Sequence, residues 1–139
     1  MSVSSNKKTL NNFALKGLTV LLVEDEPDIA YLLTFVLQRQ GAEVIFAISA
    51  EEALNKLGSE LPDILVSNIR LPNEDGYWLI EQIRLLEAHW QGQLPAIAVT
   101  SYTRDFSEAQ ALESGFDYFL SKPIDPDELT AHILTLLEP

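Results

Sequence analysis

Residues 19–41 read TVLLVEDEPDIAYLLTFVLQRQG, and the hydrophobic pattern changes its period within this one stretch. The first five residues, Thr19–Val23, form a continuous apolar run, which is typical of a strand covered on both faces of a parallel sheet. After Pro27 the apolar residues recur at helical spacing, at Ile29, Leu32, Leu33, Val36 and Leu37. Proline suits the first turn of a helix, and Gly41 suits its end. The stretch therefore predicts a strand followed by a helix.

The same unit recurs along the rest of the chain. Further apolar runs lie at Val44–Ala47, Ile64–Ser67, Ala96–Val99 and Tyr118–Leu120. Helical patterns follow them, from a capping box at Ser49 and Glu52, after Gly76, around Glu108–Ser114, and from Asp125 onward. The order is βα repeated five times, which predicts an α/β fold with a doubly wound, five-stranded parallel sheet.

The length of 139 residues suits a single domain with one core. We expect residues 1–15 to be a leader or the remnant of a linker, and residues 16–139 to form the domain. The chain stops where the last helix ends, so we expect no output domain within it. The sequence leaves open whether the domain stands alone or was excised from a longer chain.

The composition argues against several classes of protein. A formal net charge of −12 argues against a nucleic-acid-binding surface, which needs a basic patch. The absence of cysteine excludes disulfides and thiolate metal sites. No apolar run approaches the roughly 20 residues that span a bilayer, and residues 1–12 lack the apolar core of a signal peptide. We therefore expect a cytoplasmic protein that binds neither nucleic acid nor membrane.

Polar residues follow four of the predicted strands. They are Glu24-Asp25, Ser67-Asn68, Thr100-Ser101 and Ser121-Lys122-Pro123. In an open parallel sheet, ligands bind beyond the carboxyl ends of the strands, so these side chains should meet at one edge. Carboxylates suit a hard cation such as Mg²⁺, whereas a lysine and a hydroxyl suit the oxygens of a phosphoryl group.

Taken in order, these motifs resemble a known family. Glu24-Asp25, then PDILVSNIRLP at 62–72, Asp75-Gly76, Val99-Thr100-Ser101 and Lys122-Pro123 are similar to the CheY-like receiver domain of response regulators, in two-component signalling of the bacterial kind. The resemblance covers residues 18–138 and implies the flavodoxin-like arrangement of the sheet.

The resemblance implies roles for individual positions around a metal ion. Glu24 and Asp25 correspond to the acidic pair that holds Mg²⁺, and the backbone carbonyl of Arg70 would be a further ligand. Asn68 corresponds to the aspartate that receives the phosphoryl group from a histidine kinase, and it would face the same ion.

The resemblance also implies a switch. Thr100 corresponds to the hydroxyl that moves toward the phosphate, and Phe119 to the aromatic residue whose rotamer follows it. Lys122 corresponds to the lysine that contacts the phosphate, and its bond to Pro123 is expected to be cis.

Asn68 departs from the family at the residue that forms the covalent bond. A carboxylate oxygen attacks phosphorus as a nucleophile, whereas a carboxamide is a poor nucleophile and carries no charge. We therefore expect no phosphotransfer to this position, and Mg²⁺ binding that is weak or absent because two clustered carboxylates remain instead of three. We also expect the metal-free domain to be more stable than a counterpart with aspartate at position 68.

Three interpretations of Asn68 stay open. It marks a natural receiver that acts without phosphorylation, or an ordinary receiver carrying an Asp-to-Asn replacement, or a site where a neighbour accepts the phosphoryl group instead. Ser67 is the adjacent hydroxyl, but alternate residues of a strand face opposite sides, so it should point away. Separately, the Arg70 side chain either lies over Glu24 and Asp25 in the place of a cation or is exposed to solvent.

The function expected from these patterns is signalling through protein–protein contact, without enzymatic activity. Partners would be a histidine kinase, a phosphotransfer protein, or a downstream protein that binds the face of residues 108–114, 118–120 and the helix opened by Asp125; a homodimer is a further option. The outside alternative is an unrelated enzyme on a flavodoxin-like fold. The sequence gives this alternative no support, because it contains no glycine-rich phosphate loop and no histidine at the expected site.

Overall fold

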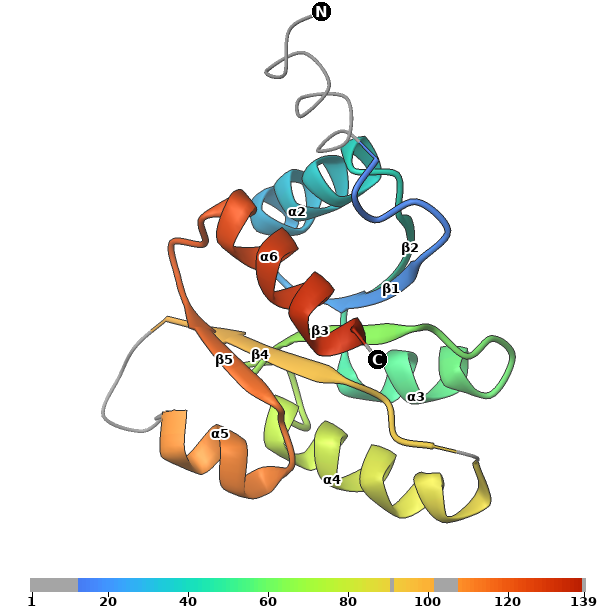
Figure 1. Ribbon diagram of the computed structural model, residues 1–139. Coiled ribbons are helices and arrows are strands. Elements are labelled where there is room, and N and C mark those ends of the chain that lie inside the picture. Colours follow the sequence, from blue (N-terminus) through green and yellow to red (C-terminus); the bar gives the residue numbers. More distant parts are fainter. Residues whose placement is uncertain (1–12, 91, 102–107, 139) are drawn as a thin grey trace, which may run out of the picture.

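The computed structural model of the chain describes residues 13–90, 92–101 and 108–138 (Figure 1). Within them, the strands are β1 (Thr19–Val23), β2 (Glu43–Ala47), β3 (Ile64–Asn68), β4 (Ala96–Thr100) and β5 (Tyr118–Ser121). They form one sheet in the order β2-β1-β3-β4-β5, and every neighbouring pair is parallel. This confirms the predicted α/β fold with a five-stranded parallel sheet.

Helices cover both faces of this sheet, which is why the strands are continuously apolar. The helices are α2 (Pro27–Arg39), α3 (Ala50–Leu57), α4 (Gly76–Leu86), the short 3₁₀ helix η1 (Glu87–His89), α5 (Glu108–Ser114) and α6 (Pro126–Leu137). Helices α2 and α6 lie on one face, and α3, α4 and α5 lie on the other (Figure 1). Each face has its own apolar core, one containing Leu33, Leu37, Leu129 and Ile133, the other Ala53, Leu79, Ile80, Ile83 and Ala111.

The starts of the helices follow the capping residues in the sequence. Pro27 lies in the first turn of α2, as predicted. The Ser49 hydroxyl accepts a hydrogen bond from the Glu52 backbone N–H at 3.1 Å. The Glu52 carboxylate, however, accepts from the N–H of Ile48 at 2.7 Å, one residue earlier than a standard capping box has it. Asp75 caps α4 in the same way, by accepting from the N–H of Trp78 at 2.9 Å.

Two residues lie differently from the sequence-based expectation. Leu15, expected within the leader, is fully buried among the residues of the α2 and α6 core, and its backbone N–H donates to the Gln40 carbonyl. The packed structure therefore includes at least this residue before position 16, while residues 1–12 of the expected leader lie outside the described residues. Leu32, expected on the buried stripe of α2, is 52% exposed because the stripe is wider than the surface that the sheet covers.

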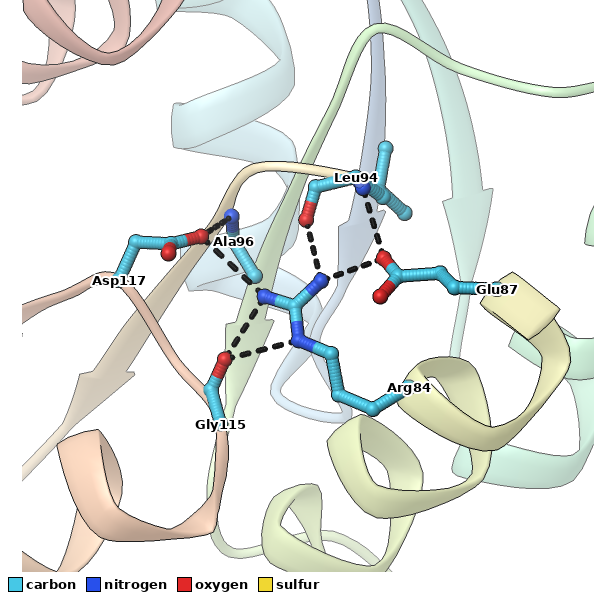
Figure 2. Close-up of polar contacts among 6 residues, drawn as sticks. All are labelled: Arg84, Glu87, Leu94, Ala96, Gly115 and Asp117. Atoms are coloured by element: carbon cyan, nitrogen blue, oxygen red, sulfur yellow. Dashed lines mark hydrogen bonds and ion pairs between the residues drawn. The ribbon is translucent and has the colours of Figure 1, made fainter. Parts of the chain in front are cut away.

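One arginine joins three segments at the edge of the sheet where β4 and β5 begin (Figure 2). Arg84 of α4 donates to the Gly115 carbonyl from Nε at 3.0 Å and from Nη2 at 2.7 Å. Its Nη1 donates to the Leu94 carbonyl at 2.7 Å and pairs with Glu87. Nη2 also pairs with Asp117 at 3.2 Å. The guanidinium thus links the end of α4, the segment before β4 and the turn before β5.

No helix of the described residues is long and apolar enough to cross a membrane.

Candidate functional site

A charged pocket of about 310 Å³ lies at the carboxyl ends of the strands. It is lined by Asp25, Glu26, Asn68, Arg70, Thr100, Ser101 and Lys122. These residues belong to β3 and β4 or directly follow β1, β3, β4 and β5. The parallel sheet therefore brings together the polar residues that the sequence marks at its strand ends.

Asn68, the last residue of β3, lies between the two carboxylates that follow β1. Its Nδ2 donates to Glu24 Oε2 at 3.2 Å and to Asp25 Oδ1 at 3.3 Å. Glu24 is 1% exposed and Asn68 is 4% exposed, so the bond between them lies largely out of water, whereas Asp25 is exposed. A buried carboxylate is costly unless it is hydrogen-bonded or paired with a cation, and the Asn68 amide supplies one of the hydrogen bonds to Glu24.

The ammonium of Lys122 supplies the charge that balances Glu24. Its Nζ lies 3.0 Å from Glu24 Oε1 and 3.5 Å from Glu26 Oε1. The Lys122 side chain is 9% exposed, whereas that of Glu26 is 58% exposed. Glu24 also accepts from the Glu26 backbone N–H at 3.0 Å. The bond between Lys122 and Pro123 is cis, as the resemblance implied.

The two expected switch residues lie on neighbouring strands at different distances from the pocket. Thr100 is buried and lines the pocket, and its hydroxyl donates to the Ser101 carbonyl at 3.3 Å. Phe119 is half-buried and packs against the apolar core beneath α3, α4 and α5 instead of lining the pocket. In the register of β4 and β5, Phe119 is paired with Ala98, two residues before Thr100.

Of the two remaining candidates, Arg70 lines the pocket and Ser67 does not. Ser67 is fully buried, does not line the pocket and donates to the Asn68 carbonyl at 2.9 Å, in line with the expectation that it points away. Arg70 is exposed and lines the pocket. The roles expected for its carbonyl and its guanidinium stay predictions.

The donor set is a poor match for Mg²⁺, the ion that the resemblance implies. Within the described part of the chain, no group of three or more His, Cys, Asp or Glu side chains could hold a metal ion. Mg²⁺ needs oxygen ligands, but Asn68 turns its NH₂ toward both carboxylates and Lys122 takes an oxygen of Glu24. As arranged, the Lys122 ion pair and two hydrogen bonds occupy both oxygens of Glu24 without a metal ion.

Two features of the site were not predicted. Glu26, which has no counterpart among the expected site residues, contacts Lys122. The signal was present in the run of three acidic residues after β1, which exceeds the acidic pair of the family motif.

The second unpredicted feature is an apolar surface beside the pocket. A cavity of about 370 Å³ between α2 and β2 is lined by Asp25, Pro27, Ala30, Tyr31, Thr34, Phe46 and Ile48. Tyr31 is 77% exposed and Ile48 is 52% exposed. Asp25 lines both cavities, so this apolar surface adjoins the charged pocket.

Comparisons with known proteins agree on one family. Residues 20–134 match the response regulator receiver domain. A putative response regulator from Chloroflexus aurantiacus has a similar structure, with a TM-score of 0.78 and 34% identity; the match covers 88% of this chain and 98% of that one.

Two relatives differ in length. The uncharacterized 14.6 kDa protein in the sodA1 3′ region of Leptolyngbya boryana is 46% identical over 83% of this chain and 86% of its own length. The alkaline phosphatase synthesis transcriptional regulatory protein PhoP of Bacillus subtilis is 35% identical over 85% of this chain. The matched region is 48% of PhoP, so the chain spans about half the length of that regulator.

Proposed function

The chain belongs to the response regulator receiver domain family, and we propose that it signals by binding other proteins without accepting a phosphoryl group at position 68. Two-component signalling is the function of the family. The proposal concerns the chemistry of this particular pocket. It also implies that the chain lacks the self-phosphorylating and dephosphorylating activity of an ordinary receiver.

The observation that carries the proposal is the environment of Asn68. The side chain ends β3 inside the charged pocket, where its NH₂ donates to both Glu24 and Asp25. An acyl phosphate forms when a carboxylate oxygen attacks phosphorus, and a carboxamide at the same position lacks that nucleophile. Ser67, the nearest alternative acceptor, has its hydroxyl bonded to the backbone and does not line the pocket.

We further propose that Mg²⁺ binds weakly or not at all. Receiver domains generally bind Mg²⁺ at their acidic pocket. Here a cation would gain two carboxylates instead of three, and it would have to break the hydrogen bonds from Asn68 and the ion pair of Lys122. Each lost charge pair weakens binding by about 1–4 kcal/mol at ~4 Å, depending on the effective dielectric.

Receiver domains interact with histidine kinases or phosphotransfer proteins. For the output partner, or a second copy of the chain, we propose the face formed by α5, β5 and α6. Strand β5 is at the edge of the sheet, and Leu112 of α5 is 44% exposed. Tyr118 of β5 stacks on His132 of α6 with their ring centroids 3.9 Å apart, which gives this face an aromatic surface.

Beryllofluoride with Mg²⁺ tests the chemistry directly, because it forms a phosphate-like adduct on an acceptor aspartate. We expect no protein-bound signal by fluorine NMR for the chain as it is, and a bound signal for Asn68→Asp. Asn55→Asp is the matched control, because Asn55 is exposed on α3 and the substitution makes the same change in charge. It should not label.

Two outcomes would contradict the proposal. Stable labelling of the unmodified chain would show that an acceptor other than an aspartate at position 68 exists. Failure of a folded Asn68→Asp variant to label, with folding checked by circular dichroism, would show that position 68 is not the acceptor position.

A further inference from the structure

Besides Asn68, the charged pocket has a second unusual feature, which is the environment of Lys122. Lys122 makes two ion pairs within the described residues, and both are with carboxylates that follow β1. The nearer is Glu24, at 3.0 Å, which is almost completely buried. The farther is Glu26, at 3.5 Å, on the solvent side of the ammonium. The lysine therefore lies between a buried and an exposed carboxylate.

Glu24 has little capacity left for another ligand. Its Oε1 pairs with Lys122, while its Oε2 accepts from the Glu26 N–H at 3.0 Å and from Asn68 at 3.2 Å. A carboxylate buried to this degree needs a neutralising charge. Because Asn68 is neutral, the ammonium of Lys122 is the positive charge that meets this need.

We propose that Lys122 is the resident counter-ion of Glu24, and that Glu26 holds it there, so a divalent cation enters only by displacing the ammonium. Glu26 and Lys122 thereby set the cation affinity of the pocket. This role does not depend on whether residue 68 accepts a phosphoryl group, because it concerns metal binding alone and needs no phosphoryl donor.

The proposal predicts that the positive charge of Lys122 weakens the binding of a divalent cation. An ammonium and a divalent cation that share the oxygens of Glu24 repel each other, and the repulsion is strong where water is scarce. Replacing Lys122 by a neutral side chain removes this competitor and the charge that the lysine supplies to Glu24. Mg²⁺ binding should therefore become tighter.

Titration calorimetry with Mg²⁺ alone tests the proposal on the full chain. We expect Lys122→Met to bind Mg²⁺ at least about tenfold more tightly than the unmodified chain, as a removed like charge requires. Lys16→Met is the matched control, because it makes the same change in net charge at an exposed residue that does not line the pocket. Its affinity should change by less than about twofold, because exposed distant charges are screened.

A second pair of variants isolates the role of Glu26. In a Glu26→Gln background, Lys122 can leave Glu24 more easily, so the gain from Lys122→Met should fall to a few-fold. An equal gain in both backgrounds would overturn the role of Glu26. Unchanged or weaker Mg²⁺ binding by Lys122→Met would overturn the counter-ion role itself.

Folding of the variants must be separated from binding. Lys122→Arg keeps the charge and should bind Mg²⁺ as weakly as the unmodified chain; a gain equal to that of Lys122→Met would overturn the proposal. If Lys122→Met is unfolded without metal, excess Mg²⁺ should restore its near-ultraviolet circular dichroism. No recovery in excess Mg²⁺ would count against the proposal. The beryllofluoride experiment on Asn68→Asp is a separate readout, so the two proposals can fail independently.

Discussion

The buried side chain of Asn68 provides an NH₂ donor to two carboxylates where an aspartate would carry a negative charge. An aspartate there would add a third negative charge beside Glu24 and Asp25, at the positions where the amide now donates at 3.2 and 3.3 Å. A hydrogen bond to a charged group contributes about 1.5–3 kcal/mol, and a like-charge contact opposes folding by a similar amount. The residue that we propose prevents phosphorylation should therefore also stabilise the metal-free pocket.

This argument predicts that Asn68→Asp lowers the free energy of unfolding in the absence of Mg²⁺, by about 1–4 kcal/mol. Urea denaturation with a chelator present measures it. Adding Mg²⁺ should restore part of the loss, because a ligand that binds only the folded state stabilises it. The exposed substitution Asn55→Asp should change stability by less than about 0.5 kcal/mol. A clear gain in stability for Asn68→Asp without metal would show that the like-charge argument is wrong.

At the same scale, the sequence predicted which residues meet in the pocket but not how they pair. The members could be predicted because parallel strands end at one edge, so Asp25, Asn68, Thr100 and Lys122 had to come together. The partner of Lys122 could not be predicted, because it depends on side-chain torsions and on the charge balance of the whole pocket. The contact with Glu26 is of this kind.

At the scale of elements, helix α4 begins directly against the backbone of the site. The N–H of Gly76, its first residue, donates to the Ile69 carbonyl at 2.7 Å. A Cβ at Gly76 would lie 2.6 Å from the Asn68 carbonyl oxygen and 2.7 Å from Ile69 Cα. Both obstacles are backbone atoms, so a side chain cannot be accommodated by a change of rotamer.

We therefore expect Gly76→Ala to destabilise the domain by about 1–3 kcal/mol, as overpacking does, and to shift the amide resonances of Asn68 and Ile69. Chemical denaturation and amide NMR spectra measure the two effects. Gly58→Ala is the control: Gly58 has helical torsions with φ −67°, and its added Cβ would meet only the Asn55 carbonyl, at 3.3 Å. Equal stability of the two variants would contradict the close approach of α4 to β3.

The elements themselves were largely predictable from local signals. The predicted run Thr19–Val23 coincides with β1, and the other strands extend the predicted runs by one residue. Capping residues and proline marked the starts of α2, α3 and α6. The exposure of Leu32 and the burial of Leu15 were not predictable, because periodicity marks an apolar stripe but not how much of it a neighbouring segment covers.

For the molecule as a whole, one cluster of polar contacts links a helix to the segments that lead into two strands of the sheet. Helix α4, the segment before β4 and the turn before β5 meet at Arg84, whose side chain is 18% exposed (Figure 2). The carboxylates around it act on the backbone as well: Glu87 accepts from the Leu94 N–H at 2.7 Å, and Asp117 accepts from the Ala96 N–H at 2.8 Å. The guanidinium and its partners therefore fix where β4 and β5 enter the sheet.

Substitution of Arg84 by methionine keeps much of the apolar stem but removes every one of these donors. It leaves the Gly115 and Leu94 carbonyls short of donors and the Glu87 carboxylate without its cation, so we expect a loss of about 2–4 kcal/mol in the free energy of unfolding. Urea denaturation of the full chain measures this loss.

Two comparisons make the Arg84 prediction specific. Arg84→Lys keeps the charge but cannot reproduce the fork that reaches Gly115 and Leu94 together, so it should recover less than half of the loss. Arg39→Met removes an arginine that lies over the exposed ring of Phe35, with 5.7 Å from its guanidinium carbon to the ring centroid. That change should cost less than about 1 kcal/mol, since a cation–π contact at an exposed site contributes only that much.

Amide hydrogen exchange should rise in β4, β5 and α5 of Arg84→Met more than in β1 and β2, because the lost contacts fix only that half of the sheet. Uniform loss of protection across all strands would show instead that Arg84 supports the fold as a whole.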